Sequence, residues 1–100
     1  MPPGTSDRAF WLRVVGDSMT APSGTSIPEG ALILVDPEVD PVSGRLVVAK
    51  LTDSDEVTFK RLMHDAGRSY LKPLNPAYPA IPINSHCTIV GVVTEAKQKL

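Results

Sequence analysis

The sequence predicts a mainly β fold, in which short antiparallel strands form a partly closed barrel or a sandwich. The first observation is the placement of its 10 prolines and 7 glycines, which lie mostly between apolar runs and leave no room for a long helix. The second is that these runs are short, β-rich and bounded by turn residues. Several short strands at roughly regular spacing are typical of an all-β domain.

The expected strands follow one another along the chain. They cover residues Phe10 to Val15, Ala31 to Val35, Leu46 to Leu51, Glu56 to Met63, Ser69 to Lys72 and Cys87 to Thr94. Residues 1–9 show no apolar periodicity, so we expect a flexible leader or linker remnant before a single domain over residues 10–100. Ala66-Gly67 is expected to form a hairpin turn, and the one helical turn is expected in Glu95 to Leu100.

Composition limits the classes of function. The 10 Lys and Arg residues are balanced by 11 Asp and Glu, so this chain alone lacks the positive charge that binding DNA requires. Apolar runs such as Ala31 to Val35 are too short to span a bilayer, so we expect no membrane partner. The single cysteine, Cys87, cannot form an internal disulfide, which indicates a reducing, cytoplasmic compartment.

The first candidate for chemistry is Ser18, in the segment Gly16-Asp17-Ser18-Met19. A glycine directly after a predicted strand permits a sharp turn that lifts the next side chains out of the sheet. A serine in that place is a candidate nucleophile. The alternative is an ordinary turn, because Gly-Asp-Ser is common turn composition.

The second candidate is Lys60, in the predicted strand from Glu56 to Met63. Period-2 alternation places Lys60 on one strand face with Thr58 and Leu62, and the other face carries Val57, Phe59, Arg61 and Met63. Such neighbours can desolvate the amine, which lowers its pKa and allows it to accept a proton from a serine hydroxyl. The alternative is an amphipathic strand whose lysine extends its amine into water.

Other polar residues have simpler interpretations. His64 and His86 are expected to be exposed turn histidines, because neither has an identifiable partner for a catalytic triad. Asp53, Asp55 and Glu56 are interpreted as a solvated hairpin end and not as a paired-carboxylate site. The sequence has neither a Cys/His cluster with metal-ligand spacing nor a glycine-rich phosphate loop, so we expect no metal and no cofactor.

Several segments, taken in order and spacing, resemble the C-terminal domain of lambda-type phage repressors, a LexA- and UmuD-like domain of the peptidase S24 type. They are Phe10-Trp11-Leu12, Gly16 to Pro22, Leu32 to Pro37, Phe59 to Leu62, Pro73 to Pro79 and Gly91-Val92-Val93, spread over residues 5–96. The resemblance implies a LexA-like β-rich fold, shared with the catalytic domain of type I signal peptidases. It also implies a transcriptional repressor of lysogeny that cleaves itself during the SOS response.

The resemblance assigns roles to the two candidates. The serine at the position of Ser18 attacks a bond in the repressor's own linker, and the lysine at the position of Lys60 is the general base. The N–H groups of Asp17 and Ser18 are the candidate oxyanion donors. A RecA filament stimulates the reaction.

Some family features have no counterpart that we recognise in the sequence. We find neither the N-terminal helix-turn-helix domain, through which the family binds operator DNA, nor the scissile Ala-Gly bond upstream of the serine. We therefore expect a fragment that lacks its own cleavage site. Asp17 stands where the family pattern can carry Asn, and a carboxylate that points towards Lys60 would raise the pKa of the amine.

A second function, from a different class, is assembly. The resemblance implies a homodimer, with a further step to a higher oligomer, that makes operator binding cooperative. The alternative to a peptidase is thus a pure oligomerisation module in which the serine-lysine pair is idle. A signal-peptidase-like enzyme acting on other proteins is disfavoured, because that role requires a membrane anchor.

The candidate assembly contacts are Tyr78, Cys87, Ile89 and Val93. Tyr78 lies on the proline-rich loop from Asn75 to Pro82, where an exposed tyrosine can anchor an interface. The other three lie on the last apolar strand, which could pair with its twin across a two-fold axis. The alternatives are a tyrosine folded back onto the domain and a strand used only for core packing.

Overall fold

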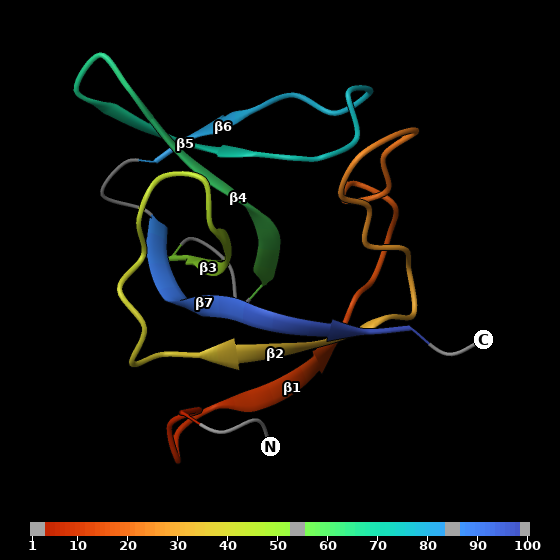
Figure 1. Ribbon diagram of the computed structural model, residues 1–100. Coiled ribbons are helices and arrows are strands. Elements are labelled where there is room, and N and C mark those ends of the chain that lie inside the picture. Colours follow the sequence, from red (N-terminus) through yellow and green to blue (C-terminus); the bar gives the residue numbers. More distant parts are fainter. Residues whose placement is uncertain (1–3, 53–55, 84–86, 99–100) are drawn as a thin grey trace.

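The computed structural model describes residues 4–52, 56–83 and 87–98, and within these ranges every regular element is a strand. The strands are β1 (Phe10–Arg13), β2 (Leu32–Asp36), β3 (Leu46–Leu51), β4 (Val57–Asp65), β5 (Arg68–Lys72), β6 (Ile81–Pro82) and β7 (Cys87–Lys97). They form one seven-stranded antiparallel sheet in the order β1-β2-β7-β3-β4-β5-β6. Figure 1 shows this sheet curled into a half-barrel, which confirms the prediction of a mainly β, partly closed fold.

The predicted strands are all present, with ends that differ by a few residues. The helical turn expected in Glu95 to Leu100 is wrong, because β7 continues to Lys97 and its last residues pair with β2. The hairpin turn at Ala66-Gly67 is confirmed between β4 and β5, where both residues have positive φ angles of 51° and 76°. β6 was not predicted, because it has only 2 residues and lies among prolines.

The curl of the sheet follows from β7, which lies between β2 and β3. Its register shifts against β2 between Leu34 and Val35, and against β3 between Val48 and Ala49. A bulge inserts an extra residue, bends the strand and increases its twist. The long arc of β7, blue in Figure 1, therefore carries the sheet round from β2 towards β4.

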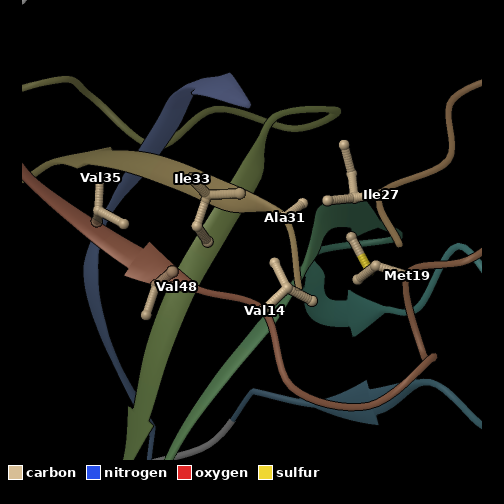
Figure 2. Close-up of a cluster of buried hydrophobic side chains, with 7 residues drawn as sticks. All are labelled: Val14, Met19, Ile27, Ala31, Ile33, Val35 and Val48. Carbon is tan, nitrogen blue, oxygen red and sulfur yellow. The ribbon is translucent and has the colours of Figure 1, made fainter. Parts of the chain in front are cut away.

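Both faces of the sheet are covered by apolar side chains. The first core cluster, drawn in Figure 2, contains Val14, Met19, Ile27, Ala31, Ile33, Val35 and Val48. The second contains Val47, Ala49, Leu62, Leu71 and Val92. Successive residues of β3 enter opposite clusters, as strand alternation requires. The loop between β1 and β2 contributes Val14, Met19 and Ile27, so it is anchored to the core at these separate positions.

The segment before β1 is tied to the end of β2. The N and Oγ of Ser6 donate hydrogen bonds to the Asp36 carboxylate at 3.1 and 2.5 Å, and the N of Glu38 donates another at 3.0 Å. The bonds from Ser6, followed by that from Glu38, lower the pKa of Asp36, whose side chain is buried. Arg8 forms an ion pair with Glu38 at 3.3 Å. The described part of the expected leader, residues 4–9, thus contains no strand but is attached to the sheet.

Replacing Gly91 tests the close approach of β7 to β2. The Cβ of Gly91→Ala would lie 2.8 Å from the Cγ1 of Val35 and 3.0 Å from the carbonyl carbon and oxygen of Asp36. Because these atoms are buried and two of them are backbone, the sheet must shift, at a cost of about 1–3 kcal/mol in the free energy of unfolding. Urea denaturation measures this loss. Thr88→Ala, exposed on the same strand, is the control, and an equal loss in both variants would contradict the explanation.

Candidate active site

Ser18 lies on a turn whose two sides are fixed in the core. Gly16 opens the turn with a φ angle of 81°, a conformation that glycine adopts without strain. Val14 and Met19 are buried on either side of it, whereas Ser18 stays partly exposed. The carbonyl of Met19 accepts a hydrogen bond from the N of Ile27 at 2.7 Å. The serine is therefore lifted out of the sheet on a well-supported backbone.

Lys60 lies on β4 and meets Ser18 across the fold. Its Nζ lies 3.0 Å from the Oγ of Ser18, 2.8 Å from the Oγ1 of Thr58 and 3.2 Å from the carbonyl oxygen of Phe59. Thr58 and Lys60 therefore share a strand face, as the alternation of β4 predicted. Sequence reasoning treated Thr58 only as a neighbour, although its position two residues away already placed its hydroxyl within reach of the amine.

Burial lowers the pKa of Lys60. The residues opposite Lys60 and Thr58 on β3 are Val47 and Ala49, so the neighbouring strand brings no charge to the amine. A neutral amine has two N–H groups and one lone pair. The carbonyl of Phe59 accepts a hydrogen bond from one N–H group, and the hydroxyl oxygen of Thr58 can accept one from the other. The lone pair of the amine is then left to accept the hydrogen bond of the Ser18 hydroxyl.

The proline-rich loop between β5 and β6 contacts the serine turn. The N of Asn75 donates to the carbonyl of Ser18 at 2.9 Å, and its Nδ2 donates to the carbonyl of Asp17 at 3.1 Å. The hydroxyl of Tyr78 donates to the Oδ1 of Asp17. That bond, together with the negative charge of Asp17, raises the pKa of Tyr78. The carboxylate of Asp17 is thus hydrogen-bonded to this loop, and the oxygens within hydrogen-bond distance of the Nζ of Lys60 are those of Ser18, Thr58 and Phe59.

Two cavities meet at the Ser18–Lys60 pair. The first, of about 160 Å³, lies over the first core cluster, and its walls include Leu12, Val14, Ile33, Val48 and Phe59. The second, of about 320 Å³, is lined by Val15, Gly16, Asp17, Tyr78, Pro79 and Ile81 together with the pair itself. Both cavities reach the serine hydroxyl, since Ser18 and Lys60 line each of them. The arrangement is suited to attack on a peptide carbonyl by Ser18.

The other polar residues considered in the sequence either lie away from this pair or fall outside the described residues. His64 is exposed at the end of β4, with its Nδ1 2.7 Å from the Oγ of Ser69. His86, Asp53 and Asp55 lie outside the described residues. In the part of the chain that the structure covers, no His, Cys, Asp and Glu side chains cluster as metal ligands would, and no helix could cross a membrane.

The expected assembly residues do not form one surface. Tyr78 is folded back towards Asp17 and remains 45% exposed. Cys87 and Ile89 pack against the second core cluster, and Val93 packs against the first. Within the sheet, β7 pairs with β3 over residues 87–92 and with β2 over residues 92–97, so pairing of this strand with its twin stays a prediction.

A β-rich fold that places a serine hydroxyl beside a partly desolvated amine has the organisation of a serine peptidase. The Peptidase S24-like family matches residues 2–94, and the chain belongs to this family. It is 65% identical over 92 residues to the repressor protein C2 of Salmonella phage P22, covering 92% of this chain and 43% of that protein. These matches confirm the resemblance seen in the sequence.

More distant relatives carry similar names. The prophage repressor CohE of Escherichia coli strain K12 is 44% identical over 89 residues, which are 87% of this chain and 38% of that protein. The LexA repressor of Geobacter sp. strain M21 is 42% identical over 91 residues, which are 88% of this chain and 43% of that protein. The chain spans about two fifths of the length of the curated relatives it matches.

The substitution Lys60→Met tests whether the amine of Lys60 is desolvated in the folded chain. Because burial lowers the pKa of Lys60, the unfolded chain binds more protons than the folded chain between the folded pKa and the unfolded value of about 10.4. Wild-type stability should therefore rise with pH relative to Lys60→Met across that range. Urea unfolding from neutral to alkaline pH measures the difference, with Lys72→Met, an exposed amine on β5, as the control. A stability difference that does not change with pH would contradict the desolvation.

Proposed function

We propose that this chain is the self-cleavage and assembly domain of a transcriptional repressor, in which Ser18 and Lys60 form a catalytic dyad. The single observation that carries the proposal is the 3.0 Å separation of the Oγ of Ser18 and the Nζ of Lys60. The lowered pKa of Lys60 supports its role as the base, and the two cavities offer a path for a peptide. Membership of a peptidase family supports the reaction type.

In the proposed mechanism, the neutral amine of Lys60 takes the proton of Ser18 while the Oγ bonds to the carbonyl carbon of the scissile peptide. The N–H groups of Asp17 and Ser18 stabilise the oxyanion. When the C–N bond breaks, the ammonium of Lys60 gives its proton to the leaving amine, and an acyl-serine remains. The amine, neutral again, takes a proton from a water molecule that attacks this ester, and it returns that proton to the Oγ of Ser18 as the ester bond breaks.

Two acceptor groups fix the orientation of the neutral amine of Lys60. The carbonyl of Phe59 and the hydroxyl of Thr58 each accept one N–H of the neutral amine, at 3.2 and 2.8 Å. The lone pair is left facing Ser18, so proton transfer requires no rotation of the lysine side chain. Thr58 is therefore a positioning residue, because it acts on the reaction through Lys60.

The relatives' names supply the biological setting of the proposal, since those named above are called repressors. In the complete repressor, a helix-turn-helix domain outside these 100 residues would bind operator DNA. Cleavage of the linker, stimulated by a RecA filament in the cytoplasm during the SOS response, would separate that domain from this one. The operator would then lose the cooperative binding that assembly provides.

Assembly is a second candidate function, and one feature of the sheet favours it. Apolar side chains that pack against the second core cluster remain only partly buried, and they are Val39, Ile81, Ile83, Cys87 and Ile89. A two-fold contact centred on Cys87 and Ile89 would cover this face without requiring a free strand edge, and it leaves out Ile81, which also lines the second cavity. The homodimer proposed here is therefore formed by side-chain packing, and it does not depend on whether the Ser18–Lys60 dyad is active.

Cleavage in trans tests the dyad. A separate polypeptide that carries the family's Ala-Gly linker should be cut by this chain, and the rate should rise with pH until Lys60 is neutral, since only the neutral amine accepts the serine proton. Ser18→Ala and Lys60→Met should each reduce the rate by at least about a hundredfold without unfolding the domain. His64→Ala, an exposed residue away from the pair, is the control. Cleavage that both substitutions leave unchanged would contradict the proposal.

Sedimentation over a range of concentrations tests assembly. We expect a dimer at micromolar concentration, and Ile89→Glu should weaken it because the substitution places a charge in the proposed apolar contact. Thr88→Glu, the neighbouring exposed position whose side chain points to the other face, should leave the dimer intact. A wild-type monomer that persists to high concentration would remove the assembly function for this chain.

A further inference from the structure

We propose that Tyr78 is a positioning residue of the active site, which holds the carboxylate of Asp17 away from Lys60 and so allows the amine to act as a base closer to neutral pH. The inference rests on the proposed function of Ser18 and Lys60. It adds a residue from the loop between β5 and β6, to which neither the family match nor the relatives' names assign a role.

The geometry is a clamp of three hydrogen bonds on two consecutive residues. Asn75 holds the backbone of the serine turn, through its N to the carbonyl of Ser18 and through its Nδ2 to the carbonyl of Asp17. Tyr78 holds the side chain of Asp17. The loop is itself braced, since the N of Tyr78 donates to the carbonyl of Asn75 at 3.1 Å and the N of Ala77 donates to the Oδ1 of Asn75 at 2.9 Å.

Asp17 supplies the acidic side chain of the cavities beside Lys60. Among the described residues, the titratable and charged side chains that line the two cavities beside Lys60 are those of Arg13, Asp17 and Tyr78. On β3, which is packed beside β4, the positions opposite Lys60 and Thr58 are the apolar Val47 and Ala49. Arg13 is a cation, and so are Arg61 and Lys72, which pair between β4 and β5 directly after Lys60. Asp17 is the acidic group in this set, and it is adjacent to the nucleophile in sequence.

The direction of the Asp17 side chain decides the charge of the amine. A carboxylate within about 4–6 Å stabilises the ammonium and raises the pKa of a lysine, by about 1–3 units. That effect opposes the burial that lowers the pKa of Lys60. Asp17 raises the pKa of Tyr78. The phenol therefore keeps its proton, and its hydrogen bond to Asp17 persists, over the pH range in which Lys60 titrates. Without the phenol hydroxyl, Asp17 is free to rotate towards the ammonium.

The experiment measures the charge of Lys60 directly, without any substrate. The chain is labelled with carbon-13 lysine, and the Cε signal of Lys60 in the NMR spectrum is identified as the one that Lys60→Met removes. The chemical shift of this signal is followed against pH, and its titration midpoint is recorded. Tyr78→Phe should raise this midpoint by about one pH unit. At pH values below the midpoint, a shift of one unit lowers the fraction of Lys60 that is neutral about tenfold, and the rate of cleavage in trans should fall by the same factor. Tyr70→Phe, the chain's other tyrosine, lies on β5 away from both cavities and is the matched control.

The Asp17→Asn background separates a charge effect from a structural one. In this background the same Tyr78→Phe change should no longer move the Lys60 midpoint, because no carboxylate remains to be released. An unmoved midpoint in Tyr78→Phe itself, or an equal shift in the Asp17→Asn background, would overturn the proposal. If the midpoints behave as expected but Ser18→Ala still cleaves in trans, the dyad fails while the coupling of Tyr78, Asp17 and Lys60 stands.

Discussion

The hydrogen-bonded amine of Lys60 is the interaction on which the rest of the site depends. It needs Ser18 at 3.0 Å, and Ser18 belongs to a loop from the far side of the sheet, so the sheet must curl to bring β4 and that loop together. The bulges of β7 supply the curl, and Gly91 allows β7 to approach β2 closely enough. Met19 buries the backbone beside the serine, so the loop cannot move away without opening the core.

The position of β7 also constrains assembly. Inside the sheet, β7 pairs with β3 over residues 87–92 and with β2 over residues 92–97. A contact between two copies that needs no free strand edge would use half-buried side chains that leave the face of this strand. The half-buried residues Cys87 and Ile89 meet that condition, whereas Val93 packs against the cluster beneath the serine loop. The face proposed for assembly and the core beneath Ser18 thus lie on opposite sides of the same strands.

The local features of the site could be predicted from the sequence, whereas the contacts between distant segments could not. The glycine before Asp17 predicted the turn, and alternation placed Lys60 beside Thr58, because both depend on neighbouring residues. The hydrogen bond between Tyr78 and Asp17 joins segments with no local relation, so only the folded chain reveals it. The end of β7 was mistaken for a helical turn because the pairing of Glu95 to Lys97 depends on β2, which is distant in the sequence.

The attachment of Ser6 to Asp36 sets a length requirement on any cleavable segment that precedes it. Asp36 lies beside the start of β1, whereas Ser18 follows its end, and the 4 residues of this strand span about 13 Å. A segment upstream of Ser6 must therefore double back along the sheet before its peptide bond can reach the hydroxyl. Tether length and direction would then be determinants of the proposed cleavage rate, separate from the chemistry of the proposed dyad.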